Sequence, residues 1–374
     1  MLHNTFCRRL AALVLTLAVA LSAALPGFAA YPMPVQTATE TESVYLFNAD
    51  TGKTILSQNA DQQKYVASLT KLMTALLLVE SGKDLNGEVT VPTDLTQEFK
   101  DIQNANGTTM GLRIGETVRR IDLLNAMLIV SANDAASVIA WDVGGSVVGF
   151  VQQMNARAAE LGMKDTHFCN CNGLPAKGHV TSAYDIALMS RELILNHPSI
   201  REYTTIWMDS LRNGASELVN TNKLIRFYEG ATGLKTGSTS QAQFCVSATA
   251  KRDHMHLIAV IMAAPTSTDR VSDASKLLNY GFANYGIKQV VAAGEQMGEV
   301  TLQKGVKPTV QVVAKDGFDF LAKKTDASEV EKRMNLESTQ RAPVKQGDTA
   351  GSVDFFVNGE QIGSTPLVYS ETVP

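Results

Sequence analysis

The sequence predicts a mixed α/β domain followed by a small all-β domain. Two observations support this prediction. Segments with helical spacing of apolar residues alternate with β-rich runs up to about residue 286, whereas only short alternating segments follow. The 374 residues suffice for one large domain and one smaller domain, at ~100–200 residues each. We place the larger domain at residues 41–286 and the β-domain at residues 291–374.

The N-terminus has the pattern of a secretory signal peptide. Arg8 and Arg9 precede an apolar run that extends to Leu25, and small residues follow it. A transmembrane anchor is the alternative, but this run is shorter than the ~20 residues that a membrane-spanning helix needs. We therefore predict a cleaved signal peptide at residues 1–29, a leader at residues 30–40, and a secreted, extracytoplasmic protein of the cell wall or periplasm.

The composition excludes several classes of function. Hydrophobic residues make up 45% of the chain, which allows a substantial core, and the net charge of −4 lacks the basic excess of a nucleic-acid-binding protein. Three cysteines remain after the signal peptide, and they are either buried apolar groups or one disulfide with a thiol left over. Three cysteines cannot build a four-cysteine zinc site and no H-E-x-x-H segment occurs, so we expect no metal and no cofactor. The three are Cys169, Cys171 and Cys245.

The secondary structure follows from periodicity and turn signals. Alternating segments predict one hairpin near the start of the large domain, at residues 43–57, and another at residues 243–264. In the β-domain, Asn358-Gly359 is a strong signal for a two-residue hairpin turn. Helical spacing predicts helices at residues 68–80, 117–130, 134–144, 183–196 and 272–285, and alternation predicts β-domain strands at 309–314, 318–321, 352–357 and 361–368.

The first segment whose side chains could carry out catalysis is Ser68-Leu69-Thr70-Lys71. Ser68 opens a buried apolar helix, where the helix dipole favours developing negative charge, and Lys71 lies at i+3 on the same face. A serine hydroxyl needs a base, and a lysine can be that base if burial or a neighbouring cation lowers its pKa. Lys235 is a candidate for that cation. The alternative is a helix-capping serine followed by an ordinary solvated lysine.

Two further segments carry side chains that could take part in catalysis or substrate binding. Ser131-Ala132-Asn133 lies between two predicted helices, where side chains can project into a cleft, although it could also cap the helix that begins at Asp134. Lys235-Thr236-Gly237 leads into a β-rich run. A strand edge with an ammonium, a hydroxyl and a glycine that permits close approach would suit a peptide with a free terminal carboxylate.

In this order, S-x-x-K, S-x-N and K-T-G resemble the motif set of penicillin-binding proteins and serine β-lactamases. Three longer segments are similar to D-alanyl-D-alanine carboxypeptidases: residues 172–185, Thr232–Gly237 and the tail at 344–368. The resemblance covers nearly the whole mature chain. It implies the penicillin-binding, β-lactamase-like transpeptidase fold, in which helices flank an antiparallel sheet and a β-domain follows.

The resemblance also implies a function and a set of roles. Residues 41–286 would be a peptidase domain that removes the terminal D-Ala from peptidoglycan stem peptides, and β-lactams would inhibit it by acylating the same serine. The implied roles are Ser68 as nucleophile, Lys71 as proton acceptor, Ser131 as proton relay to the leaving nitrogen, Asn133 as a partner of the substrate backbone, Lys235 and Thr236 as carboxylate ligands, Gly237 as the close-approach position, and the Ser68 and Ser238 amides as the oxyanion hole.

Three other functions are less compatible with the sequence. A serine β-lactamase shares the motifs, but such enzymes usually lack a trailing β-domain, and we identify no E-x-x-x-N segment between the second and third motifs that could supply a deacylating glutamate. A non-catalytic cell-wall scaffold would not need the serine and the two lysines. An α/β-hydrolase esterase would need a G-x-S-x-G elbow, which is absent. The C-terminus lacks the amphipathic helix that often anchors family members, so the resemblance leaves membrane association in doubt.

Overall fold

The computed structural model describes residues 34–40, 42–212 and 214–374. The predicted signal peptide lies outside these residues. The described part of the predicted leader runs beside α10 (Ser267–Asn284), where the Ala38 amide donates to Asp273 Oδ2 at 2.8 Å. The Lys276 ammonium donates to the Gln36 carbonyl at 3.3 Å. These residues are therefore tied to the helix by hydrogen bonds.

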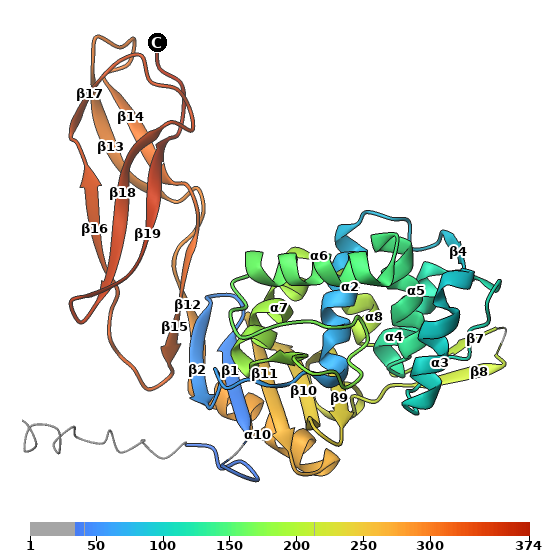
Figure 1. The fold of residues 1–374 in the computed structure, drawn as a ribbon. Coiled ribbons are helices and arrows are strands. Elements are labelled where there is room, and N and C mark those ends of the chain that lie inside the picture. Colours follow the sequence, from blue (N-terminus) through green and yellow to red (C-terminus); the bar gives the residue numbers. More distant parts are fainter. Residues whose placement is uncertain (1–33, 41, 213) are drawn as a thin grey trace, which may run out of the picture. The chain divides into compact units, whose positions relative to one another are not determined.

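The large domain is built around a five-stranded sheet with the order β2-β1-β11-β10-β9 (Figure 1). Every neighbouring pair in it is antiparallel, as the resemblance implied. The two predicted hairpins are confirmed, and they supply four of the five strands. The strands are β1 (Ser43–Asn48), β2 (Lys53–Gln58), β9 (Ala231–Thr239), β10 (Gln243–Arg252) and β11 (Met255–Ala264).

Helices cover both faces of this sheet. β11 lies at its centre and is buried along almost its whole length, so its sequence is a continuous apolar run rather than an alternating one. Ile258 and Val260 belong to the large core shared with the helical region. Leu257 points the other way, toward α10, where a Cβ on Gly281 would come within 2.5 Å of it. In Figure 1, α10 and α7 (Ala183–Asn196) lie on opposite sides of the sheet.

The helical region is organised around α2 (Thr70–Glu80), which begins directly after the 3₁₀ turn η1 (Ala67–Leu69). Eight of its eleven residues are buried, because helices surround it. The other helical segments are η2 (Thr93–Leu95), α3 (Thr96–Asn104), α4 (Arg120–Ile129), α5 (Asn133–Gly144), α6 (Val147–Glu160), η3 (Pro198–Ile200), α8 (Arg201–Thr204) and α9 (Leu224–Phe227). Three short strand pairs connect them: β3 (Lys64–Tyr65) with β6 (Val180–Thr181), β4 (Glu88–Thr90) with β5 (Thr117–Arg119), and β7 (Met208–Leu211) with β8 (Ser216–Val219).

The structure differs from the predicted elements at several places. Residues 117–119 pair as β5 instead of opening the predicted helix, because Thr117 and Val118 find partners in β4. α6 was not predicted; Ser146 caps it by accepting from the Gly149 amide. β9 is a separate strand that precedes the β-rich run predicted from Gln243, and it forms over residues of weak β-propensity because it pairs with β10.

The β-domain is confirmed as an all-β unit. A six-stranded sheet has the order β16-β18-β19-β14-β13-β17, and β12 pairs with β15 separately. Asn358 and Gly359 both have positive φ, at 51° and 83°, as a type I′ hairpin turn requires. The strands are β12 (Tyr285–Val291), β13 (Gln296–Gln303), β14 (Thr309–Ala314), β15 (Phe318–Lys323), β16 (Glu331–Leu336), β17 (Thr339–Arg341), β18 (Thr349–Val357) and β19 (Glu360–Tyr369).

Within the described residues, no single helix has both the length and the apolar character needed to cross a membrane. The pair α5 and α6 passes that test only when taken together, across a bend of 83°.

The burial of α2 gives a stability prediction. Leu76 is fully buried in the core, whereas Leu77 on the same helix is only partly buried. We expect Leu76→Ala to lower the free energy of unfolding by about 2–5 kcal/mol, because it removes transfer energy and leaves a cavity. Leu77→Ala, the matched control, should cost clearly less. Urea unfolding followed by circular dichroism measures both, and equal losses would contradict this account of the core.

Candidate active site

The candidate site lies where η1 and α2 meet the edge strand β9. Ser68 lies in η1 and is half-buried, while Lys71 lies in the first turn of α2 and is fully buried. Lys71 Nζ is 3.0 Å from Ser68 Oγ. The i+3 spacing therefore brings the lysine within hydrogen-bonding distance of the serine, as the sequence predicted.

Two oxygen atoms orient the Lys71 amine. Asn133 Oδ1 accepts from Nζ at 2.7 Å, and the Asn172 carbonyl accepts from it as well. Neither oxygen can donate a proton. A neutral lysine has two N–H groups and one lone pair, so these two acceptors take the N–H groups and leave the lone pair for the Ser68 hydroxyl. The arrangement is that of a base positioned on a nucleophile.

Burial shifts the protonation of both lysines. Desolvation lowers the pKa of Lys71 to about 7 from 10.5. It also holds the pKa of Lys235 well below its ordinary value, and the positive charge of Lys71 lowers it further. The sequence predicted burial together with a cationic effect of Lys235 on Lys71. Burial lowers the pKa of Lys71, as predicted. The repulsion between the two ammonium groups lowers the pKa of Lys235 rather than that of Lys71.

Asn133 is the best-connected side chain of the second motif. Besides accepting from Lys71, it donates from Nδ2 to the Thr108 carbonyl at 3.0 Å. The neighbouring Asp134 is buried and accepts from the amides of Met110 and Leu112, both at 3.0 Å. These bonds hold the loop before α4 against the start of α5.

Ser131 does not cap the following helix. Ala132 occupies the N-cap position, and no side chain caps α5 there. The Ser131 hydroxyl is buried and makes no hydrogen bond within the described residues. Its φ is +67°, a conformation that costs a non-glycine residue energy and that occurs often at functional sites. The capping alternative is therefore wrong, and the structure leaves this hydroxyl unpaired.

The third motif lies on β9, which runs beside η1. A Cβ on Gly237 would be 2.9 Å from the Ser68 amide nitrogen and 3.1 Å from Ala67 Cβ, so only glycine permits this approach. Lys235 is buried and donates to the Thr236 carbonyl at 3.0 Å. The Thr236 hydroxyl shares a hydrogen bond of 2.7 Å with Thr221. Ser238 follows as an exposed strand residue paired with Phe244.

Arg270 and Gly173 support the site. Arg270 had no signal in the sequence, and Gly173 lay in a segment of family resemblance without a predicted role. Arg270 on α10 is buried and donates from Nη1 to the carbonyls of Gly237 and Cys245, at 3.2 and 3.3 Å. A Cβ on Gly173 would be 2.0 Å from the Ala67 carbonyl oxygen. Both contacts join segments distant in the chain, which periodicity cannot detect.

The three cysteines form no disulfide within the residues that the structure describes. Cys169, Cys171 and Cys245 are all free thiols. An E-x-x-x-N segment does occur between the second and third motifs, at Glu192–Asn196, so the interpretation that none occurs there is wrong.

That glutamate is nevertheless far from Ser68. Arg157 Nη2 donates to Glu192 at 2.6 Å and to Glu80 at 2.7 Å. Glu80 is the last residue of α2, twelve residues after Ser68 and about 18 Å away at 1.5 Å per residue. Glu192 therefore lies at the opposite end of α2 and cannot activate water at the serine.

The fold and the serine–lysine pair define a serine peptidase domain that is followed in the chain by a β-domain. Comparison with known proteins gives the particular family. The family described as D-alanyl-D-alanine carboxypeptidase matches residues 31–266, and the penicillin-binding protein 5 C-terminal domain matches residues 285–374. The chain belongs to the D-alanyl-D-alanine carboxypeptidase family.

Individual relatives agree with this membership. D-alanyl-D-alanine carboxypeptidase DacF of Bacillus subtilis (strain 168) is 33% identical over 340 residues, 90% of this chain and 86% of the relative. The structure of penicillin-binding protein 5 from Haemophilus influenzae is 29% identical with a TM-score of 0.78, covering 91% of this chain and 98% of that one. Penicillin-binding protein 6B from Escherichia coli is 28% identical with a TM-score of 0.71, and covers the same shares.

The buried Lys71 gives a prediction about stability and pH. Its pKa is lower in the folded state than in the unfolded state, so unfolding binds a proton between about pH 7 and 10.5. Stability of the wild type relative to Lys71→Met should therefore rise with pH above 7, by up to about 1.4 kcal/mol per pH unit. Urea unfolding at pH 7, 8 and 9 measures this difference. Parallel curves for the two proteins would show that Lys71 titrates normally.

Proposed function

We propose that this protein removes the terminal D-Ala from peptidoglycan stem pentapeptides through an acyl-enzyme on Ser68. The observation that supports this most directly is the Lys71 amine, at 3.0 Å from Ser68 Oγ with its pKa lowered to about 7. A base whose pKa lies near the working pH is present in its neutral form in a large fraction of the molecules, and it still binds a proton strongly enough to remove one from a hydroxyl. Family membership supports the same substrate, because the relatives are named for D-alanyl-D-alanine carboxypeptidase activity.

In the first step, Ser68 Oγ transfers its proton to Lys71 Nζ and bonds to the carbonyl carbon of the penultimate D-Ala. The amide bond to the terminal D-Ala then breaks, while Ser131 donates its proton to the leaving nitrogen and takes up in exchange the proton that Lys71 had accepted. Its unpaired hydroxyl, in an uncommon backbone conformation, supports this role. Water then hydrolyses the ester and frees Ser68.

The oxyanion hole would consist of the Ser68 and Ser238 amides. The close approach of Gly237 to the Ser68 amide supports this assignment, because it brings the β9 edge beside the nucleophile. Losing one such donor typically lowers the rate about 10²–10³-fold. Asn133 would offer its second Nδ2 hydrogen to the substrate backbone, while Lys235 and Thr236 would hold the terminal carboxylate.

The setting of the reaction belongs to the same proposal. The signal peptide at residues 1–29 would send the protein to the cell wall or periplasm, where its substrate lies. The peptidase domain would span residues 41–286 and the β-domain residues 291–374. β-Lactams would acylate Ser68 as inhibitors, in keeping with the penicillin-binding proteins that the chain resembles.

Removing the nucleophile tests the central claim. We expect Ser68→Ala to abolish D-Ala release from a pentapeptide and labelling by fluorescent penicillin, because no other hydroxyl contacts Lys71 in the described residues. Ser275→Ala, a serine on α10 outside the site, is the matched control and should retain both. Labelling retained by Ser68→Ala would mean another nucleophile. Comparison with nitrocefin turnover separates this activity from that of a β-lactamase.

The pH profile tests the role of Lys71. Since the neutral amine is the base, the rate of acylation by fluorescent penicillin should rise with pH through a midpoint near 7. Lys71→Ala should slow acylation strongly while far-UV circular dichroism remains that of the folded protein. A profile that is flat from pH 6 to 8.5 is incompatible with this base.

Lys235 is tested by the charge of the substrate. We expect Lys235→Ala to reduce kcat/KM about tenfold or more for a pentapeptide with a free terminal carboxylate, because a charge-assisted hydrogen bond is lost. The same peptide amidated at its C-terminus should lose much less. Equal losses for the two peptides would reject the carboxylate role.

A further inference from the structure

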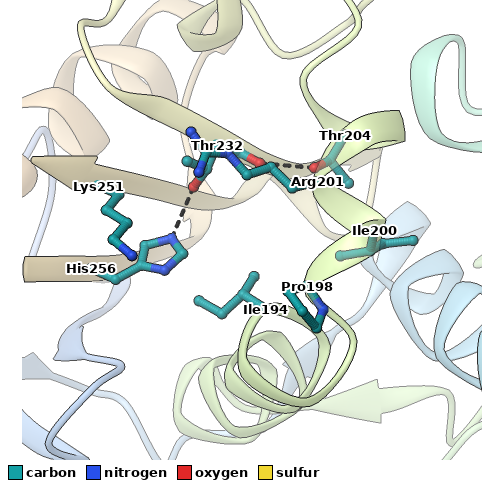
Figure 2. A pocket seen from close by; sticks show the side chains of 8 residues that line it. All are labelled: Ile194, Pro198, Ile200, Arg201, Thr204, Thr232, Lys251 and His256. Atoms are coloured by element: carbon teal, nitrogen blue, oxygen red, sulfur yellow. Dashed lines mark hydrogen bonds between the residues drawn. The ribbon is translucent and has the colours of Figure 1, made fainter.

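A second cavity lies apart from the candidate active site, between β9, β11 and the segment that joins α7 to α8 (Figure 2). Its volume is about 100 Å³. Ile194 and Ile200 form an apolar side, while Thr232 and His256 face it from the strands. None of its lining residues belongs to the three catalytic motifs, so the proposed reaction does not explain it.

Two cations line this cavity. Arg201 begins α8 and Lys251 lies on β10, and within the described residues neither side chain has an ion pair or a hydrogen bond. Burial, together with the charges of Lys251 and Arg201, lowers the pKa of His256 to about 4. No acidic residue lines the cavity among the residues that the structure describes. The cavity therefore carries two uncompensated positive charges.

The polar groups of the wall are held in place. The Thr249 and Thr232 hydroxyls share a hydrogen bond of 2.7 Å, and Thr232 Oγ1 is 2.9 Å from His256 Nε2. Thr204 Oγ1 donates to the Thr232 carbonyl at 2.8 Å. His256 Nδ1 has no partner among the residues that the structure describes. An imidazole fixed through one nitrogen can offer the other as a donor.

We propose that this cavity binds one phosphate-type dianion. Two positive charges match the charge of the dianion, and the planar guanidinium of Arg201 can bind two of its oxygens. The volume of about 100 Å³ is large enough for a single tetrahedral oxyanion. The apolar wall from Ile194 and Ile200 lowers the local dielectric and strengthens the attraction.

The test is a calorimetric titration of the full mature protein with inorganic phosphate, at constant ionic strength maintained with chloride. We expect one site per chain. The double variant Arg201→Gln/Lys251→Gln should weaken binding about tenfold or more, because two charge-assisted contacts are lost. Lys164→Gln, which removes another exposed lysine, should bind phosphate as the wild type does. Dimethyl phosphate, a monoanion, should bind at least several-fold more weakly than phosphate.

Three outcomes overturn the proposal: no heat of binding with the wild type, unchanged affinity in the double variant, or equal affinity for dimethyl phosphate. D-Ala release by the double variant should equal that of the wild type, since neither residue belongs to the proposed catalytic machinery. That control confirms that the variant is folded. It also keeps the result independent of the proposed reaction, because phosphate binding can fail while D-Ala release persists.

Discussion

The structure depends on one energetically costly feature, an amine buried completely at the start of an apolar helix. An ammonium in such a place is strongly disfavoured, so the fold lowers the proton affinity of Lys71 instead of leaving a charge unpaired. The two oxygens of Asn133 and Asn172 then determine which way the amine points. The core around α2 thus has two consequences. It stabilises the domain, and it lowers the pKa of Lys71 to about 7, as the proposed role of this side chain as a base requires.

This dual role explains why distant parts of the chain meet at the same point. α5 contributes Asn133, the segment before β6 contributes the Asn172 carbonyl, and β9 contributes Lys235 with the adjacent Gly237. Each belongs to an element that is fixed elsewhere: β9 by its pairing with β10, and α5 by its packing in the core. The site is therefore preorganised by the same contacts that form the domain.

The sequence predicted those parts of the site that lie within one periodic segment. Ser68 and Lys71 share a helix face, so i+3 spacing sufficed, and the buried helix followed from its apolar residues. The Asn358-Gly359 turn was equally local. Lys235 and Gly237 were identified by motif, but β9 was missed as a separate strand because tertiary pairing produces it. Asn172 contributes a backbone oxygen and Arg270 acts across the sheet, so neither has a signature in spacing. The E-x-x-x-N segment shows the converse, since Glu192 matches a pattern yet lies at the wrong end of α2.

The contact between Gly237 and the Ser68 amide has a mechanical implication. Because backbone meets backbone there, main-chain geometry defines the gap between the strand edge and the nucleophile. Side chains change rotamer within picoseconds to nanoseconds, but packed main chain in a sheet and a helix start moves far less. The separation between Ser68 and the strand edge is consequently nearly constant. It is a rigid property of the scaffold, insensitive to the rotamers of the surrounding side chains.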